Sequence, residues 1–390
     1  MSIFNSLGSN YNFSFVLKSL FSLYGDTRDL EKLLEEKYGG KAILLYQGRE
    51  AIELALKTLN LSEGSFVAIN GFTCFAVYDA VKNAGFNVEY LDIGRGELNF
   101  SAGTLEQAIG KNSEIKVVII QNTLGYPCDI ERISSICKKN NLILIEDLAH
   151  SVGTKYDSGE ESGTVGDITI FSFSQDKMID GISGGALISH DSIEPDFKSL
   201  PISQQVIDKV YPLFTFTIRR TYPIKIGKII HFVLKKLNFL SNPMKNMNGF
   251  HNLPAWYSKL IFQQFEKLDD NLNHRKTIAS IYAKSINPKI LSPKIIDEIH
   301  LSSNLRFPIF VENRQGLIKF LEDNRLFISD IWYDAPIAPK KYLQFTNYSG
   351  QCPNAELASA EIVNLPTHMN VSEIDAQNLS QLINQWLQSR

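Results

Sequence analysis

The sequence predicts an α/β fold built on a mostly parallel sheet. Between residues 41 and 191, short apolar runs alternate with amphipathic stretches of helical period, which is the pattern that strands and helices give in an α/β layer. The chain has 390 residues, of which 44% are hydrophobic and 21% charged, so it can form about two to three domains with packed cores. This composition excludes disordered, collagen-like and coiled-coil chains.

Seven strands are expected in this region, at residues 42–46, 66–69, 88–91, 115–120, 142–145, 168–173 and 186–189. Amphipathic helices are expected between the earlier strands, at 51–59, 76–84, 104–109 and 130–140. Ligands of such sheets bind at the carboxyl ends of the strands. The residues that directly follow each strand are therefore the first candidates for chemistry.

The alternation stops after residue 200 and resumes near residue 264, where a strand is expected at 305–311 and helices at 315–324 and 373–387. We therefore predict a large domain over 1–248, with a basic amphipathic insert at about 201–248. A smaller C-terminal α/β domain is predicted over 249–390, and its first segment is expected at a dimer contact.

Charge and cysteine usage narrow the class of protein. The 39 basic and 42 acidic residues give a net charge of −3, which argues against a general affinity for nucleic acid. Cys74, Cys128, Cys137 and Cys352 form no CxxC pair, and no histidines stand at ligand spacing beside them, so neither a disulfide framework nor a metal site is expected. The N-terminus does not resemble a signal peptide, and no apolar stretch reaches the roughly 18–20 residues of a membrane span. We expect a cytoplasmic protein.

Two charged residues follow neighbouring predicted strands. Asp147 lies in the sequence Ile-Glu-Asp-Leu-Ala-His at 145–150, and Lys177 ends Phe-Ser-Phe-Ser-Gln-Asp-Lys at 171–177. Either residue alone has a plain structural explanation, a helix N-cap for Asp147 and a solvated charge for Lys177. Together they suit a pyridoxal phosphate (PLP) pocket, in which the lysine forms a Schiff base and the carboxylate keeps the pyridinium nitrogen protonated.

A turn after the first predicted strand could bind the phosphate. Gly48-Arg49-Glu50-Ala51 opens a helix, and the free backbone N–H groups of a helix N-terminus attract anions. A simple strand–helix turn would have the same sequence. The chain lacks GxGxxG and GxxxxGK[ST], so dinucleotide and P-loop sites have no support.

As a set, these motifs resemble the DegT–StrS family of PLP-dependent nucleotide-sugar aminotransferases. The resemblance runs from about residue 41 to 191 and from 249 to the C-terminus. The matching segments are Gly48, Phe72-Thr73-Cys74, Leu124-Gly125-Tyr126-Pro127, Glu146-Asp147-Leu148-Ala149-His150, Phe171-Ser172-Phe173 with Lys177, Gly184-Gly185, Asn252-Leu253 and Leu365-Pro366-Thr367-His368. It implies the fold of the type I PLP enzymes, the aspartate-aminotransferase type.

The resemblance also implies a role for each catalytic residue. Lys177 holds the cofactor and moves a proton between the cofactor and the substrate carbon. Asp147 pairs with the pyridine nitrogen, and His150 lies near the ring hydroxyl.

By the same resemblance, Ser172 and the backbone amides of Gly48, Arg49 and Glu50 hold the cofactor phosphate. Asn252 reaches the phosphate of a neighbouring subunit, which implies a homodimer.

The chain departs from the family pattern at several positions. Cys74 stands where many members place an aromatic residue that stacks on the cofactor, and either Phe72 or Phe75 could replace it. Asn122 occupies a position where histidine is common, and Ser183 replaces a glutamate. Arg49 and Glu50 replace a Thr-Ala pair, so only their backbone contacts are carried over.

The basic insert has three interpretations. Its helix carries an apolar stripe of Ile226, Ile229, Ile230, Val233 and Leu237, with Lys225, Lys228, His231, Lys235 and Lys236 mostly on the other face. In the first interpretation, the stripe packs on the chain's own domain or at a dimer contact. In the second, segment 211–240 lies on an anionic membrane. In the third interpretation, the basic residues attract a diphosphate or an acidic glycan.

The leading functional hypothesis is the transfer of an amino group, from L-glutamate, to a keto group of a nucleotide-activated sugar in the biosynthesis of a surface polysaccharide or related glycan. One alternative is a PLP enzyme with another reaction, such as a sugar dehydratase or an amino-acid enzyme. By the family resemblance, Lys177 argues against the dehydratase, because dehydratases of the family carry histidine there. The other alternative is a PLP-binding regulatory protein without turnover.

Overall fold

The computed structural model describes residues 3–22, 25–191, 193–329 and 331–389. It contains a seven-stranded sheet in the order β2-β9-β8-β7-β6-β3-β5. These strands are β2 (Lys41–Leu45), β3 (Phe66–Asn70), β5 (Asn87–Leu91), β6 (Ile115–Ile120), β7 (Ile143–Asp147), β8 (Ile168–Ser172) and β9 (Gly185–Ser189). Only β9 runs against its neighbours. The predicted seven-stranded, mixed and mostly parallel sheet is confirmed.

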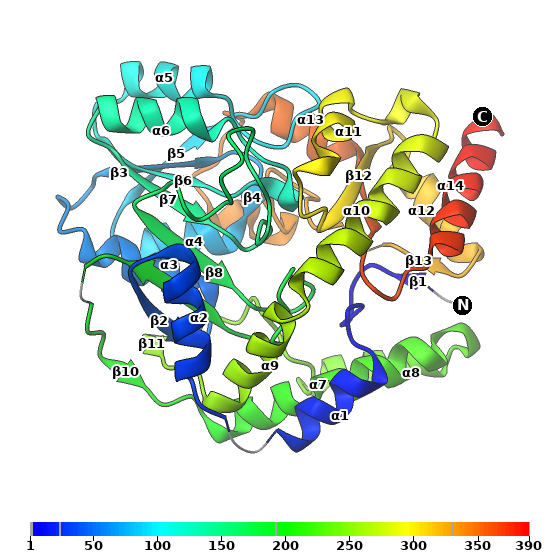
Figure 1. Ribbon diagram of the computed structural model, residues 1–390. Helices are drawn as coiled ribbons and strands as arrows, with labels where there is room; N and C mark the ends of the chain where they lie inside the picture. The colour runs from blue at the N-terminus through cyan, green and yellow to red at the C-terminus, as the bar shows by residue number, and fades with distance from the viewer. Residues whose placement is uncertain (1–2, 23–24, 192, 330, 390) are drawn as a thin grey trace.

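Helices cover both faces of this sheet. Helices α3 (Gly48–Thr58) and α4 (Phe75–Asn83) lie on one face, and α5 (Ala102–Lys111) and α6 (Ile130–Lys139) lie on the other (Figure 1). Side chains alternate between the two faces of a strand. Successive residues of β6 therefore pack in different hydrophobic cores, one on each face of the sheet. Ile119 packs in the core with α3 and α4, whereas Val118 packs in the core with α5 and α6.

The C-terminal region forms a second α/β unit around the antiparallel pair β12 (Arg306–Phe310) and β15 (Ile362–Pro366). The region also contains α10 (Leu268–Ser285), α11 (Pro293–Asp297), α12 (Arg314–Asp323), α13 (Pro353–Glu361) and α14 (Glu373–Gln388), with the short helices η3 (Pro288–Ile290), η4 (Glu298–His300) and η5 (Lys340–Phe345). The N-terminal strand β1 (Ile3–Phe4) pairs with β13 (Leu326–Phe327) of this region. The strand β4 (Thr73–Cys74) pairs with β14 (Ile337–Ala338), so the two regions are joined at both points.

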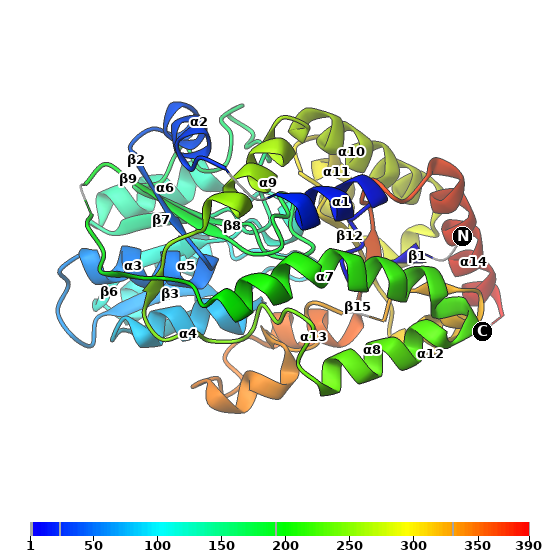
Figure 2. The same cartoon turned by 90° about the horizontal axis from the view of Figure 1, so that it is seen from below.

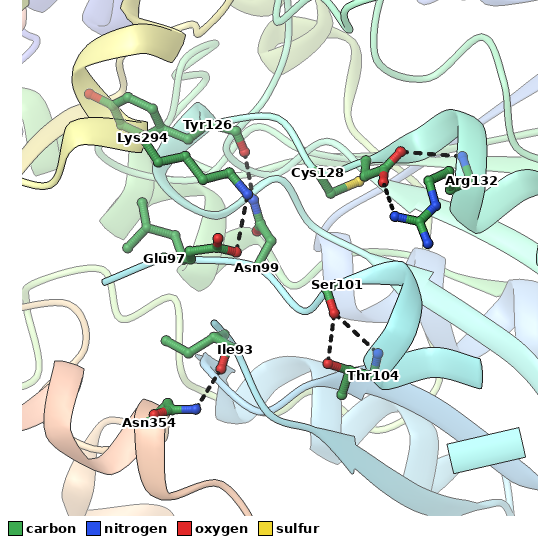
Figure 3. Close-up of polar contacts among 12 residues, drawn as sticks. Ile93, Glu97, Asn99, Ser101, Thr104, Tyr126, Cys128, Arg132, Lys294 and Asn354 are labelled. Atoms are coloured by element: carbon green, nitrogen blue, oxygen red, sulfur yellow. Dashed lines mark hydrogen bonds and ion pairs between the residues drawn. The ribbon is translucent and has the colours of Figure 1, made fainter. Parts of the chain in front are cut away.

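Polar contacts also tie the C-terminal region to the loop that follows β5 (Figure 3). Lys294 of α11 forms an ion pair with Glu97, with 3.1 Å between Nζ and Oε2. The side-chain amide of Asn354, on α13, donates a hydrogen bond of 3.0 Å to the carbonyl oxygen of Ile93. The division of the chain at residue 248 remains a prediction.

The predicted insert forms α7 (Ile202–Thr221), the short helix η2 (Tyr222–Ile224) and α8 (Ile226–Lys236). Helix α1 (Phe13–Phe21) packs against α7, and α7 packs against α8. All three are visible together when the molecule is viewed from below (Figure 2). The remaining elements are α2 (Arg28–Tyr38), α9 (Ala255–Phe265), η1 (Thr123–Gly125) and the pair β10 (Phe197–Lys198) and β11 (Phe250–His251). Within the described residues, no helix is both long enough and apolar enough to cross a membrane.

Candidate active site

Adjacent strands bring the predicted site residues to one edge of the sheet. Strands β6, β7 and β8 are parallel neighbours, so their carboxyl ends place Gln121, Asp147 and Ser172 side by side. Strand β2 runs in the same direction, and Gly48 follows it at the start of α3. Together with Lys177, these residues line a cavity of about 970 Å³.

The first turn of α3 forms an anion cradle with Ser172. A Cβ atom on Gly48 would lie 2.8 Å from the Cβ atom of Ser172, so only glycine allows this close approach. No side-chain hydrogen bond caps the N-terminus of α3, and its first N–H groups have no acceptor within the helix. This arrangement suits a phosphate group.

The side chains of Arg49 and Glu50 have other partners. The Arg49 guanidinium forms a 3.1 Å ion pair with Asp79. The Glu50 carboxyl group accepts a 3.0 Å hydrogen bond from the backbone N–H of His251 and lies 3.1 Å from Nδ1 of its ring. Burial raises the pKa of Glu50 to about 8. Both side chains therefore have partners within the chain, and their backbone groups remain the proposed contacts to a ligand.

Asp147 is buried and held by two hydrogen bonds. Its Oδ2 atom accepts one of 3.0 Å from Nε2 of Gln121, and its Oδ1 atom accepts one of 3.0 Å from the backbone N–H of Ala149. The hydroxyl group of Thr73 donates to Oε1 of Gln121, which fixes the orientation of the amide. Burial raises the pKa of Asp147, although the amide bonds and Lys177 oppose the shift. A cation bound beside this carboxylate would stabilise its charged form.

Lys177 lies in the loop between β8 and β9, with its side chain at the cavity wall. Burial lowers the pKa of its amino group, and the nearby Cys74 and Asp147 oppose that shift. Its Nζ atom lies 4.8 Å from the ring centre of Trp332. A lysine with a lowered pKa is more often present as the neutral, nucleophilic amine.

The buried carboxyl group of Asp180 fixes the loop that carries Lys177. It accepts hydrogen bonds from the hydroxyl group of Tyr11 at 2.7 Å, the backbone N–H of Asp176 at 2.8 Å and that of Ile182 at 3.0 Å. Burial raises the pKa of Asp180 to about 7. The N-terminal segment thus holds the lysine loop in place from outside the sheet.

His150 is neutral, because burial, with Lys177 and Arg306 nearby, lowers the pKa of its ring. Its Nδ1 atom accepts a 3.1 Å hydrogen bond from the backbone N–H of Leu124, which leaves the proton on Nε2. The ring stacks on Trp332 with 5.2 Å between ring centres. His150 can therefore donate from Nε2 to an oxygen of a ligand.

The structure brings together most of the predicted site. The residues that line the common cavity are Lys177, Asp147, His150, Ser172, Gly48, Arg49 and Cys74. Glu50 lies behind the cavity wall, and Asn252 is exposed and outside the cavity of its own chain. Neither Phe72 nor Phe75 lines the cavity, since they stack on Tyr333 and Tyr342 respectively.

Sequence reasoning missed Gln121, Asp180 and Trp332. Gln121 directly follows a predicted strand, so the strand-end rule could have identified it. Asp180 and Trp332 carry no such signal, because neither directly follows a strand and their side-chain partners lie far away in the sequence.

These residues fit PLP. The cradle at Gly48 has no room for a side chain on that residue, and the uncapped N-terminus of α3 suits a phosphate. A buried carboxylate and an amine with a lowered pKa line the same cavity. PLP has a phosphate ester, a basic ring nitrogen and an aldehyde. The cradle suits the phosphate, the carboxylate suits the ring nitrogen, and the amine suits the aldehyde.

Known proteins resemble this chain over most of its length. The DegT/DnrJ/EryC1/StrS aminotransferase family matches residues 11–198 and 244–384. GDP-perosamine synthase of Escherichia coli O157:H7 is 24% identical over 91% of this chain and 88% of its own length. The UDP-4-amino-4,6-dideoxy-N-acetyl-beta-L-altrosamine transaminase of Campylobacter jejuni serotype O:2 is 30% identical over 75% of this chain and 72% of its own length.

Solved structures share the fold. The crystal structure of a DegT DnrJ EryC1 StrS aminotransferase from Brucella abortus superposes with a TM-score of 0.68 at 21% identity, covering 96% of this chain and 94% of that one. The family match omits residues 199–243, and this gap covers most of the predicted insert.

Proposed function

The chain belongs to the DegT/DnrJ/EryC1/StrS aminotransferase family, and on this premise we propose that it transfers an amino group from L-glutamate to a keto carbon of a nucleotide-activated sugar. The enzyme is a PLP-dependent aminotransferase. The observation that carries the assignment is the shared cavity of Lys177, Asp147 and the cradle at Gly48. We place the reaction in the cytoplasm, in the biosynthesis of a surface polysaccharide or related glycan.

Lys177 and Asp147 have different tasks in the proposed reaction. Bound PLP supplies an electron sink for the carbon that exchanges its proton. The Nζ atom of Lys177 takes that proton and returns it, because its lowered pKa favours the neutral base. Asp147 would stabilise a positive charge at the ring nitrogen of bound PLP, and Gln121 and Ala149 fix the direction of its carboxylate.

Residues at the other end of the cavity bind and orient the cofactor. The hydroxyl group of Ser172 and the first amides of α3 hold the phosphate. His150 donates from Nε2, since Leu124 occupies its other nitrogen. Burial of these groups excludes water and strengthens every one of these contacts.

The relatives support the substrate class. Those named above are, by name, synthases or transaminases of nucleotide-linked amino sugars, and a third is a dTDP-3-amino-3,6-dideoxy-alpha-D-galactopyranose transaminase. The experiment is to incubate the PLP-loaded protein with L-glutamate and a panel of 4-keto and 3-keto nucleotide sugars, and to measure 2-oxoglutarate. Formation of more than one equivalent of 2-oxoglutarate per enzyme site only when a keto sugar is present supports the proposal, since glutamate alone can yield one equivalent at most. A half-reaction with glutamate but no keto-sugar acceptor would refute the substrate class.

We further propose that the enzyme is a homodimer in which Asn252 reaches the partner's phosphate site. Asn252 is exposed and forms a β-bridge with Leu45, close to the cradle but outside its own cavity. Mixing Lys177→Ala chains with Asn252→Ala chains tests the shared site. If sites are shared, mixed dimers regain one intact site and exceed the summed activity of the two separate variants. No such gain, with subunit exchange verified, excludes the role.

A further inference from the structure

The segment that the family match omits forms most of one surface of the molecule. We call this the underside surface and define it as the exposed side chains of α1, α7, η2 and α8. The three long helices lie side by side (Figure 2). The rings of Phe13, on α1, and Phe216, on α7, are 6.0 Å apart, so the surface is continuous between these two helices.

Large apolar side chains are exposed on this surface. On η2 and α8, Ile224 is 65% exposed, Ile229 is 64% exposed and Phe232 is 68% exposed. Phe21 of α1 and Ile202 of α7 are also well exposed. Most of the exposed large hydrophobic side chains of the described chain belong to the underside surface or directly follow α8. Such clustering of exposed apolar side chains is typical of interaction sites and not of ordinary protein surface.

The way α8 packs explains why its apolar stripe is uncovered. A Cβ atom on Gly227 would lie 2.2 Å from the carbonyl oxygen of Ile218, so α8 touches α7 along the side that carries Gly227. His231, which lines the catalytic cavity, is likewise only partly exposed. Within the stripe, Ile230 is partly covered, whereas Ile229 is 64% exposed and Val233 is 43% exposed, so most of the stripe is not packed on the chain's own domain.

The underside surface also lacks exposed carboxylates. Residues 209–265 contain nine Lys or Arg residues and no Asp or Glu, and α1 contains no acidic residue. The single carboxylate of α7, Asp208, is buried and accepts hydrogen bonds from Tyr46 at 2.7 Å and Tyr257 at 2.6 Å. Lys225, Lys228, Lys235 and Lys236 are exposed around the apolar stripe.

We propose that the underside surface binds the enzyme to the surface of an anionic lipid membrane. An amphipathic helix with basic flanks inserts its apolar side chains at the level of the headgroups, while the lysines contact lipid phosphates. A nucleic acid would leave the exposed isoleucine and phenylalanine side chains uncovered. A second copy placed face to face would oppose two sets of lysines with no carboxylate to pair with them.

Membrane binding through α8 would also place the catalytic site close to the lipid. Tyr222 and His231 line the cavity from the inner side of the same helical segment. The cavity wall and the exposed stripe are therefore separated by one helix diameter, about 10 Å. The enzyme would work at the membrane surface without crossing it.

The test is co-sedimentation of the PLP-loaded full-length enzyme with vesicles. Phosphatidylcholine vesicles with roughly one-third phosphatidylglycerol should bind it, and pure phosphatidylcholine should bind it much more weakly. Raising the salt from about 0.1 M to about 0.5 M should weaken the binding. Lys235→Gln/Lys236→Gln should reduce it about thirtyfold, and Ile229→Asp/Phe232→Asp should abolish it.

Matched controls lie on other surfaces. Lys138→Gln/Lys139→Gln on α6 and Ile374→Asp on α14 alter exposed residues and should leave vesicle binding unchanged. Equal binding to neutral vesicles, or no binding to either kind, would overturn the proposal. So would a change of oligomeric state in Ile229→Asp/Phe232→Asp, measured by light scattering, because it would assign the surface to a second copy. Binding of poly-L-glutamate that is as tight as vesicle binding and insensitive to the aspartate substitutions would point to an acidic protein partner instead.

Discussion

The catalytic cavity and the underside surface use charge in opposite ways. In the cavity, burial displaces the pKa values of Asp147, Lys177 and His150 from their ordinary values, and fixed hydrogen bonds hold the carboxylate and the imidazole. On the underside surface, the lysines of α8 stand in solvent, and the one acidic residue of α7 is buried in the core. Reactivity comes from desolvation in the first region, whereas recognition of a large charged surface comes from exposure in the second.

The contrast predicts the largest effect for Lys177. Lys177→Ala should lower turnover by at least about 10⁴-fold, because it removes both the covalent attachment and the proton-transferring base. The exposed residue Lys111, on α5, provides the matched control as Lys111→Ala. The measurements are 2-oxoglutarate formation and the mass of the protein after borohydride reduction with PLP. A reducible PLP adduct that survives in Lys177→Ala would assign the attachment to another lysine.

Asp147→Asn should reduce turnover by roughly 10²–10⁴-fold while some PLP binding remains. A neutral amide cannot stabilise a protonated ring nitrogen, so the electron sink is weakened. The exposed residue Asp297 provides the control as Asp297→Asn. Turnover near that of the unchanged enzyme would remove Asp147 from the mechanism.

The same substitution should change how stability depends on pH. Burial raises the pKa of Asp147 in the cofactor-free chain, so the unfolded chain loses this proton at lower pH than the folded chain does. The unfolding free energy should then fall as pH rises from the ordinary carboxyl value of about 3.9 towards the raised value. Denaturant unfolding across this window should show a shallower fall for Asp147→Asn. An unchanged slope would mean that the carboxylate ionises normally in the folded chain.

A smaller effect is expected for Gln121, which acts on the reaction through Asp147. Gln121→Leu removes a hydrogen bond to a carboxylate and should lower kcat roughly tenfold, with little change in the KM for the sugar. In the unchanged enzyme, the hydrogen bond from Gln121 lowers the pKa of Asp147. Its loss should raise that pKa and so move the acidic limb of the pH–rate profile to higher pH. Gln107→Leu on the exposed side of α5 is the control. A profile that keeps its shape while only stability falls would indicate a purely structural role.

The underside surface should give the smallest effect in solution. Ile229→Asp/Phe232→Asp should keep turnover on a soluble keto sugar within about twofold, and stability within about 0.5 kcal/mol, because both side chains are exposed. Thermal unfolding and steady-state kinetics without vesicles measure both. A large loss of turnover would show that the underside surface and the catalytic cavity do not act independently.

Much of the fold and of the cofactor site followed from the sequence. The strands were predictable because buried parallel strands need continuous apolar runs, and the strand-end rule then selected Asp147 and the loop of Lys177. Gly48 was recognisable because a phosphate turn at a helix start requires a residue without a side chain. Motif, period and position can identify a residue when its partners lie in the same or the next element, although Gln121 was missed.

Tertiary structure alone decided the rest, because it joins segments that are distant in the chain. Trp332 meets Lys177 and His150 across more than 150 residues, and Tyr11 reaches Asp180 from the N-terminal segment. Helix α8 packs on α7, with a close approach at Gly227. The sequence shows that a helix is amphipathic, but the side that it turns to solvent is set by packing against its neighbours, and here that packing leaves the apolar stripe outside.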